Sequence, residues 1–333
     1  TAGGYRIAVL AVSLFGEMPA AVRCTFDPDG SYAPTYIPLG VDKAFCAGVI
    51  GMDMLDPRYD KAIEIAAESV SIDFLVAPLE YAEHPNTARI ELAGTDGKTR
   101  LTVWARSTGG GVVEIFRIDE TALEISGKYL DAFVQLGDKA PLDKFLGFVN
   151  KDPAFQLIGE INSSVDRFIQ IRILTNARED AMWLKARDEI EEIRIADPVF
   201  FLRKGDPLFE SAEQMAEYSR SAGLTLGEAG LAYESGLLGI SQEEASREMY
   251  ARYEVMRGSV EEGLDGKSAK LAWLKPHAAG IARANSEGRL PFGGTHTKAA
   301  ARALAVMHTC NSRGIVCAAP TGGSAGVLPG VLM

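Results

Sequence analysis

Hydrophobic positions in the first 125 residues follow both helical and strand spacing. Ile7–Phe15 is an Ala-rich apolar stretch typical of a buried helix, and Tyr59–Glu68 also predicts a helix. Short apolar runs bounded by turn signals, including Asp27-Pro-Asp-Gly30 and Thr95-Asp-Gly97, predict strands. The strands are expected at Val22–Phe26, Ile72–Val76, Ala88–Leu92, Leu101–Ala105 and Val112–Ile118. Residues 1–125 are therefore predicted to form an α+β domain.

Residues 127–203 show a different order of elements, β-α-β-β-α-β. Helices are expected at Pro141–Val149, with Pro141 in the first turn, and at Glu179–Ile190. The strands are expected at Tyr129–Leu136, Ala154–Ile161, Phe168–Leu174 and Ile193–Phe201. This order is that of a ferredoxin-like unit. Such a domain senses ligands or pairs subunits, and a purely structural spacer is the alternative.

Residues 207–333 are predicted to be helical. Two capping boxes, Thr225-x-x-Glu228 and Ser241-x-x-Glu244, mark helix starts. A further helix is expected at Thr297–Ser312, with Gly314 as its C′ residue. After the second capping box, residues at helical spacing predict one buried core face: Ala245, Met249, Tyr253, Met256 and Val260. In the Thr297–Ser312 helix another set shares one face: Ala300, Leu304, Met307 and Asn311.

Composition narrows the class of protein. The 333 residues are 47% hydrophobic and 24% charged, which is ordinary for a globular protein of two or three domains. The net charge of -11 argues against non-specific nucleic-acid binding. No apolar run approaches the roughly 20 residues that cross a bilayer. The start, Thr1-Ala-Gly-Gly, has no basic region and no initiator Met, so it is not predicted to be a signal peptide. We expect a chain that begins after a removed or omitted segment.

Cysteine usage predicts a reducing, cytoplasmic setting. The four cysteines, Cys24, Cys46, Cys310 and Cys317, are too few for a disulfide framework in a chain of this length. The spacing Cys310-x6-Cys317 fits no standard zinc site.

The segment Ile315–Gly330 carries the most specific pattern. An apolar run leads into a loop of small residues, in which Thr321 and Ser324 offer hydroxyl groups. Glycines let a backbone approach a ligand closely. A helix starting near Val327 would point free N–H groups at the loop and favour a carboxylate or a metal-bound oxyanion. A tight structural turn is the alternative interpretation.

Two other glycine-rich segments are candidates for ligand contact. Ser107-Thr-Gly-Gly-Gly111 lies between two expected strands, where a bulged hairpin is an equally good interpretation. Thr1-Ala-Gly-Gly precedes an apolar helix and predicts an anion-friendly N-terminus. An amino-terminal Thr is also a possible nucleophile activated by its own amine.

Other polar residues give weaker signals. His296 and His308 lie near the two ends of the Thr297–Ser312 helix, and a surface or core role is the simpler interpretation of each. Asp42 and Asp53 lie in a loop-rich stretch and are expected to be solvated. The sequence contains no Ser/His/Asp order, P-loop or dinucleotide fingerprint.

Taken together, these segments resemble the iron–sulfur L-serine dehydratase family. Thr1-Ala-Gly-Gly-Tyr-Arg-Ile-Ala resembles the end of that family's Ser-Ser-Ser-His-Thr-Ala-Gly loop, and Glu83-His-Pro-Asn-Thr87 resembles its His-Pro-Asn-Thr motif. Ser107–Gly111 is similar to its Ser-x-Gly-Gly-Gly turn, and the middle block to its ACT-like domain. Three further stretches resemble its α region: Met256–Lys267, Ala303–Met307 with Asn311, and Ala318–Gly330.

The resemblance implies a carbon–oxygen/ammonia lyase of amino-acid metabolism and gluconeogenesis. Such an enzyme converts L-serine to pyruvate and ammonia. Its [4Fe–4S] cluster, held by three cysteines, acts as a Lewis acid on the hydroxyl leaving group, and no pyridoxal phosphate is implied. The expected domains are a β-like domain (1–125), an ACT-like domain (127–203) and an α-like helical domain (207–333). A homodimer, or a companion chain supplying the rest of the α region, is the expected assembly.

The resemblance also implies the residues of the site. The catalytic candidates are Thr1, Ser107, Thr321 and Ser324. The substrate-binding candidates are Gly109, Gly110, Asn311, Gly322 and Gly323. We expect these loops to share one cavity, with Asn311 beneath them.

The sequence departs from the family pattern at the metal ligands. Ala325 stands where the family has its loop cysteine, and Ala cannot ligate iron. Pro38-Leu-Gly-Val-Asp42 keeps only Gly40 and Asp42 of the family's Gly-His-Gly-Thr-Asp loop. Cys310 and Cys317 are weak replacement candidates, because a Cys in an apolar run is more simply a buried hydrophobe.

Three interpretations of these departures stay open. The first is an incomplete chain that lacks the remaining cysteines. The second is a paralogue with an altered metal site or none, acting on another β-substituted or β-hydroxy amino acid. The third is a non-catalytic partner that binds an amino acid for regulation.

Overall fold

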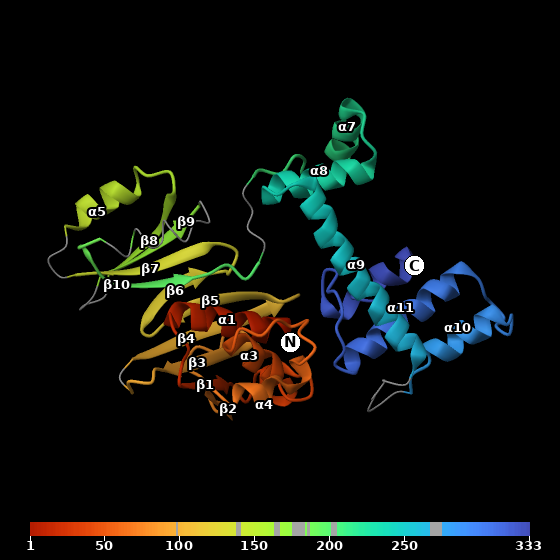
Figure 1. Cartoon of the computed structure of the whole chain (residues 1–333), viewed down its shortest axis with the longest axis horizontal. Coiled ribbons are helices and arrows are strands. Elements are labelled where there is room, and N and C mark those ends of the chain that lie inside the picture. Colours follow the sequence, from red (N-terminus) through yellow and green to blue (C-terminus); the bar gives the residue numbers. More distant parts are fainter. Residues whose placement is uncertain are drawn as a thin grey trace. The chain divides into compact units, whose positions relative to one another are not determined.

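The computed structural model shows an α+β protein with two β-sheets (Figure 1). It describes residues 1–97, 99–137, 141–162, 167–174, 184, 187–200, 205–266 and 275–333. The chain divides into two compact units, Thr1–Leu202 and Arg203–Met333. Both sheets belong to the first unit, and the elements described in the second unit are helices.

The first sheet has six strands in the order β2-β1-β3-β4-β5-β6. β1 and β2 pair in parallel, and the other pairs are antiparallel. The strands are β1 (Ala21–Phe26), β2 (Ser71–Val76), β3 (Thr87–Ala93), β4 (Arg100–Gly109), β5 (Val112–Ile118) and β6 (Thr121–Ile125). All five strands predicted for this block are confirmed. The short edge strand β6 has no expected counterpart.

Two helices lie side by side against this sheet (Figure 1): α1 (Ala2–Phe15) and α3 (Val41–Val49). They approach closely because Gly48 has no side chain, and a Cβ there would lie 2.5 Å from the carbonyl oxygen of Tyr5. The α1 residues Ile7, Leu10 and Leu14 are fully buried in the main core. The shorter helices are α2 (Tyr32–Thr35), η1 (Tyr59–Lys61) and α4 (Ala62–Ala66), and the last two confirm the predicted Tyr59–Glu68 helix.

The loop assignment of Asp42 was wrong, because Asp42 lies in the first turn of α3. Seven of the nine residues of this helix are buried. The helix starts at Gly40 without a side-chain cap, so the sequence carries no capping signal for its start.

The second sheet has four antiparallel strands in the order β10-β7-β9-β8. The strands are β7 (Leu130–Leu136), β8 (Phe155–Asn162), β9 (Arg167–Ile173) and β10 (Ile190–Ala196), and α5 (Leu142–Val149) connects β7 to β8. Because β9 lies between β7 and β8, the strands follow the split β-α-β arrangement of a ferredoxin-like unit.

Three boundaries in this block differ from the prediction. Pro141 is the N-cap of α5 and not part of its first turn. The last strand runs over Ile190–Ala196, and it stops before Pro198, which lacks the N–H that a strand ladder needs. The predicted helix Glu179–Ile190 lies mostly outside the described residues, and Ile190 itself begins β10.

The second unit contains a set of packed helices (Figure 1). They are α7 (Ala212–Ala222), α8 (Leu226–Leu238), α9 (Gln242–Asp265), α10 (Ala278–Ser286), α11 (Thr295–Asn311), η2 (Gly322–Ser324) and α12 (Val327–Leu332). α9 and α11 meet at Gly263, where a Cβ would lie 2.7 Å from the Cα of Ala305. The buried Thr309 hydroxyl donates to the carbonyl oxygen of Ser259 at 2.7 Å and ties the same two helices.

The predicted buried face of α9 is only partly correct. Ala245, Met256 and Val260 are buried, but Met249 is 57% exposed and Tyr253 is half-buried. The contacts of α9 with α11 lie toward the C-terminal end of α9, at Ser259, Val260 and Gly263. Met249 lies outside this contact region, so its helical spacing does not lead to burial.

The end of α11 uses a different residue from the predicted Gly314. Arg313 has the left-handed conformation, with φ 69°, and Gly314 follows it. The N–H of Gly314 donates to the Thr309 carbonyl and the N–H of Arg313 to the Cys310 carbonyl, which is a Schellman motif. Gly314 is needed for space instead, because a Cβ there would lie 2.5 Å from Cγ2 of Thr309.

Within the described parts of the chain, the structure contains no helix with the length and apolar character required to span a bilayer.

The capping box of α8 gives a direct test of the helical unit. The N–H of Glu228 donates to the Thr225 hydroxyl at 3.2 Å, and the N–H of Thr225 donates to the Glu228 carboxylate at 2.8 Å. We expect Thr225→Ala to lower the free energy of unfolding by about 1 kcal/mol, because helix N–H groups lose their acceptor. Urea denaturation followed by circular dichroism measures this change. Thr225→Ser keeps the hydroxyl and is the control, and equal stability of both variants would contradict the capping role.

Candidate functional site

The first turn of α1 packs directly against the β4–β5 hairpin. A Cβ on Gly3 would lie 2.7 Å from Cβ of Ser107, so only glycine fits at this position. Gly3 is buried, and Ser107 is 8% exposed. Two segments that are distant in sequence, Thr1–Gly4 and Ser107–Gly111, therefore meet inside the first unit.

The Ser107 side chain is held by neighbours on several sides. Its hydroxyl donates to the carbonyl oxygen of Val112 at 3.3 Å and also hydrogen-bonds with the Tyr32 hydroxyl. Burial raises the pKa of Tyr32 to about 12, although the hydrogen bond with Ser107 acts in the opposite direction. Tyr32 therefore stays protonated at neutral pH. The Ser107 hydroxyl is engaged by other groups of the protein. These hydrogen bonds give Ser107 a role in positioning the hairpin.

The His-Pro-Asn-Thr segment joins the same cluster through Asn86. The backbone N–H of Ser107 donates to the Asn86 carbonyl at 3.2 Å, and Nδ2 of Asn86 donates to the Ser107 carbonyl at 3.1 Å. Nδ1 of His84 accepts from the Asn86 N–H at 3.1 Å. Since Nδ1 is an acceptor, a neutral His84 ring carries its proton on Nε2.

The turn at Gly109–Gly111 confirms the conformation that its glycines permit. The three φ angles are 109°, 60° and 80°, which other residues rarely adopt. The strand register shifts between Ser107 and Gly109, so the segment is the bulged hairpin that was one of its two interpretations. Gly109 and Gly110 are exposed, and the turn presents bare backbone to the surface.

The Pro38–Asp42 loop completes this cluster. The Thr1 hydroxyl donates to the carbonyl oxygen of Leu39 at 2.9 Å. Gly40 has φ 65° and caps the N-terminus of α3, and a Cβ on Gly4 would lie 2.7 Å from Cγ1 of Val41. The left-handed conformation explains why position 40 is a glycine. The loop lies against the start of α1.

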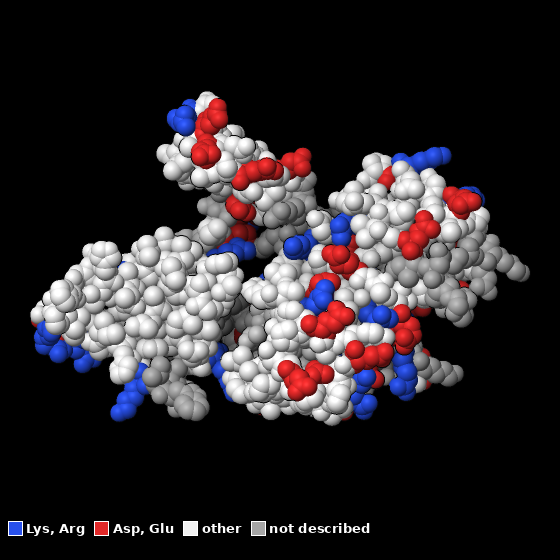
Figure 2. Space-filling view, turned by 180° about the vertical axis from the view of Figure 1, so that it is seen from behind, with Lys and Arg blue, Asp and Glu red and all other residues white. Residues whose placement is uncertain are grey.

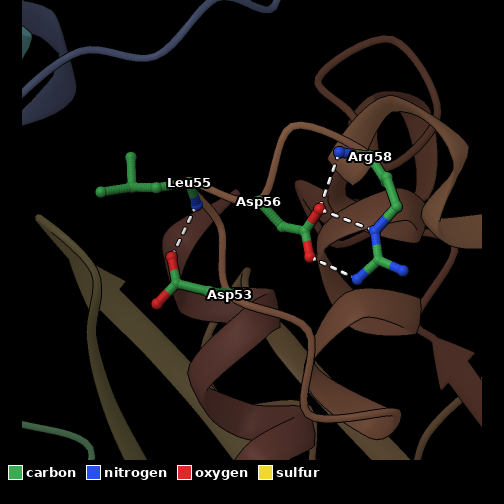
Figure 3. Close-up of polar contacts among 4 residues, drawn as sticks. All are labelled: Asp53, Leu55, Asp56 and Arg58. Atoms are coloured by element: carbon green, nitrogen blue, oxygen red, sulfur yellow. Dashed lines mark hydrogen bonds and ion pairs between the residues drawn. The ribbon is translucent and has the colours of Figure 1, made fainter.

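The acidic loop after α3 has a local role (Figure 3). The exposed Asp53 accepts a hydrogen bond from the N–H of Leu55 at 2.7 Å. Asp56 accepts from the backbone and the guanidinium of Arg58, and the side-chain hydrogen bond lowers the pKa of Asp56 to about 2. These carboxylates stabilise the turn itself, and the expectation that Asp53 is solvated is confirmed.

In the second unit, the hydroxyl groups of Thr321 and Ser324 lie next to each other at 3.1 Å. The Ser324 hydroxyl also lies within hydrogen-bond distance of the carbonyl oxygens of Ala319 and Thr321, and it accepts from the Thr321 N–H at 3.2 Å. Helix α12 begins at Val327, as predicted. Thr321, Gly322 and Gly323 are exposed, so this loop also presents its backbone at the surface.

The loop is seated on α11 through its glycines. A Cβ on Gly326 would lie 3.0 Å from the carbonyl carbon of Ala303, and one on Gly330 would lie 2.8 Å from the Ala299 oxygen. Asn311 is exposed at the end of the same helix. Asn311 and the Thr321–Ser324 loop therefore belong to one helical unit. The shared cavity predicted for both units stays a prediction.

The cysteines do not fit a cluster with three thiolate ligands. Cys24 and Cys46 are buried in the core of the first unit, and burial raises the pKa of both thiols. The half-buried Cys317 donates its thiol hydrogen to the Arg252 carbonyl at 3.5 Å. Ala325 is fully buried among apolar residues, including Val260 and Val306. Within the described ranges, no three His, Cys, Asp or Glu side chains gather where they would hold a metal ion.

Sequence reasoning missed three residues of the first-unit cluster: Arg6, Tyr32 and Asn86. Arg6 and Asn86 lie inside segments that resemble the family, but other residues of these segments were chosen as site candidates. Tyr32 carries no local signal, because only the fold brings it to Ser107.

Comparison with known proteins identifies the class. Residues 169–333 match the family described as serine dehydratase alpha chain. The chain is 38% identical over 140 residues, 42% of its length, to a probable L-serine dehydratase beta chain of Bacillus subtilis, of which it covers 61%. It is 25% identical over 176 residues, 53% of its length, to the L-serine dehydratase beta chain of Peptoniphilus asaccharolyticus, covering 78% of that chain. These similarities support an assignment to the serine dehydratase family.

The relatives come from two kinds of polypeptide. A probable L-serine dehydratase alpha chain of Bacillus subtilis is 25% identical over 125 residues, 38% of this chain and 42% of that protein. The chain thus spans about three fifths of the first beta relative and two fifths of the alpha relative. Segments that occur in separate beta and alpha chains are joined here in one polypeptide.

The contact between Gly3 and Ser107 can be tested with a double-mutant cycle. We expect Gly3→Ala to destabilise the protein by about 1–3 kcal/mol, because the added methyl overpacks against the Ser107 side chain. Ser107→Gly removes that side chain, so Gly3→Ala should cost much less in the Ser107→Gly background. Urea denaturation of the four proteins measures the coupling. Additive effects would show that the two residues do not touch.

Proposed function

We propose that this chain forms the beta-type region and part of the alpha-type region of an L-serine ammonia-lyase. The observation that carries the proposal is the convergence of four segments inside the first unit. The start of α1, the Pro38–Asp42 loop, the His84–Thr87 segment and the Ser107–Gly111 turn are joined by the contacts described above. Each of these segments resembles a signature segment of the serine dehydratase family.

The cluster has the chemistry of a small polar ligand site. Backbone at Gly109 and Gly110 is exposed, Thr1 supplies a hydroxyl, and His84 supplies a ring with one nitrogen engaged internally. Loops of this kind hold a carboxylate and an ammonium group without large side chains. We propose the same role for Thr321, Gly322, Gly323, Ser324 and Asn311 of the second unit.

The proposed reaction removes water from L-serine. A base takes the α-proton and the β-hydroxyl leaves, giving 2-aminoacrylate, which tautomerises to the imine. Hydrolysis of the imine then yields pyruvate and ammonia, so the water that is lost is regained. Because the cysteines of this chain do not provide three neighbouring ligands, we assign no step of the reaction to an iron–sulfur cluster.

A further α-type segment is the partner that the second unit fits best. The alpha relative is matched over only 42% of its length, so a serine dehydratase alpha chain contains more than this chain shares with it. Helix α12 exposes Val327, Leu328, Val331 and Leu332, between 42% and 73% each. Figure 2 shows a broad face of this unit with few charged side chains. Exposed apolar patches of this kind mark protein interfaces, and we propose that an apolar helix of the remaining α region covers α12.

The proposed activity predicts that pyruvate forms from L-serine. The measurement is pyruvate production under anaerobic conditions, by the chain alone and with a polypeptide carrying the remaining α region, together with iron and sulfide content. We expect turnover, accompanied by iron, when that region is supplied. Colourless protein that turns over another β-hydroxy amino acid instead would favour the paralogue without a cluster.

The regulatory alternative predicts a different result. A non-catalytic binding protein would be stabilised thermally by L-serine and would form no pyruvate under any of these conditions. That outcome would rule out the lyase proposal.

A further inference from the structure

Arg6 in the second turn of α1 is a half-buried cation beside the glycine turn. Its Nη1 donates to the carbonyl oxygen of Gly111 at 2.7 Å. Its guanidinium carbon lies 4.2 Å from the centroid of the Phe200 ring, which covers one face of the group. Burial lowers the pKa of Arg6 from its usual value. Arginine side chains do not lose their proton in proteins, so the group carries a positive charge.

No anion among the described residues neutralises Arg6. Across the described ranges, no carboxylate lies within ion-pair distance of its guanidinium, whereas Arg106 pairs with Glu114 at 2.9 Å and Arg172 with Asp131 at 3.1 Å. A guanidinium has five N–H donors, and one of those of Arg6 donates to the Gly111 carbonyl. A partly buried charge without a partner costs free energy, and a bound anion would recover it.

The guanidinium of Arg6 lies directly against the glycine turn. A Cβ on Gly111 would lie 2.5 Å from Nη1 of Arg6, so glycine is what allows the guanidinium to lie against the turn. Ala2 and Ser107 border the same place, since the Gly111 Cβ would lie 3.2 Å from Cβ of Ala2, and Gly3 packs on Ser107. The donor fork of Arg6 therefore lies among the segments of the candidate site.

We propose that Arg6 binds the carboxylate group of the amino-acid substrate. This inference rests on the proposed function, and it assigns the group that recognises the substrate and not the group that does the chemistry. Arginine suits the task because its planar donors match the two oxygens of a carboxylate. The substrate class is then a free α-amino acid, in which that carboxylate is unblocked.

The competing role for Arg6 is structural. Its bond to Gly111 and its stacking on Phe200 tie α1 to the hairpin and to the stretch after β10. Arg117 offers a matched control, because its Nη1 donates to the Glu120 carbonyl at 2.6 Å and its guanidinium carbon lies 4.2 Å from the Tyr81 ring centroid. The two arginines make the same kinds of contact, but Arg117 is not beside the glycine turn.

The test compares Arg6→Gln, Arg6→Lys and Arg117→Gln by isothermal titration calorimetry with L-serine and with L-serinamide, which lacks the carboxylate. We expect Arg6→Gln to weaken L-serine binding about tenfold or more, because charged hydrogen bonds are lost. Arg6→Lys should recover part of the affinity, since it keeps the charge without the fork. Arg117→Gln should bind as the wild type does. Binding of L-serinamide should not respond to any of the three changes.

Several outcomes would overturn the assignment. Arg6→Gln protein with wild-type affinity for L-serine would do so, as would equal losses for L-serine and L-serinamide, which indicate a structural role. Melting temperatures show whether each variant is folded, and Arg6→Lys keeps the test valid if Arg6→Gln is not. Wild-type protein that binds L-serine without forming pyruvate would overturn the lyase proposal alone, whereas absence of binding to any β-hydroxy amino acid would overturn both.

Discussion

The side chain of Ser107 fills the space where a Cβ on residue 3 would be, and this contact decides how the first unit is assembled. Because α1 starts with two buried glycines, its first turn can lie directly on the β4–β5 hairpin. The hairpin in turn is held to the His84–Thr87 segment by paired hydrogen bonds between Ser107 and Asn86. The same start of α1 reaches the Leu39 carbonyl through Thr1. One close backbone approach therefore gathers four loops that no local pattern connects.

The second unit uses the same principle with different elements. Gly263 of α9 and Gly326 and Gly330 around α12 let these segments touch the backbone of α11. The Thr321–Ser324 loop lies just before Gly326, and its hydroxyl groups hydrogen-bond within the segment 319–324. These glycines allow close packing between helices. Where the packed loop also exposes its backbone, the same glycines make it available to a ligand.

Among the described residues, several charges are paired with an opposite charge, whereas the half-buried Arg6 forms no ion pair with any of them. Asp56 and Arg58 satisfy each other in a surface turn, and Asp131 is paired with Arg172 inside the first unit. Arg6 instead has a carbonyl oxygen and an aromatic ring as its described neighbours. Ala325 is buried and the cysteines are dispersed, so an iron–sulfur cluster would need ligands other than those gathered in the described residues.

The sequence by itself determined the secondary structure wherever a pattern was local. It predicted five strands of the first sheet, the strands of the second sheet, the capping box at Thr225 and the helix start at Val327, because alternation, turn residues and caps act over a few neighbours. A bulged hairpin at Ser107–Gly111 was one of its two interpretations of that segment, and the structure has this hairpin. The family resemblance followed from the order of several such motifs, and the comparisons support it.

Tertiary structure decided what depends on partners far away in the chain. Helix α3 was missed because no side-chain cap marks its start at Gly40. Met249 was misplaced because helical spacing does not show whether another helix covers a residue. The roles of Tyr32 and Arg6 are invisible in the sequence, since each is defined by a neighbour about 75 to 105 positions away. Spacing reports which residues share a face, but only the fold determines what that face meets.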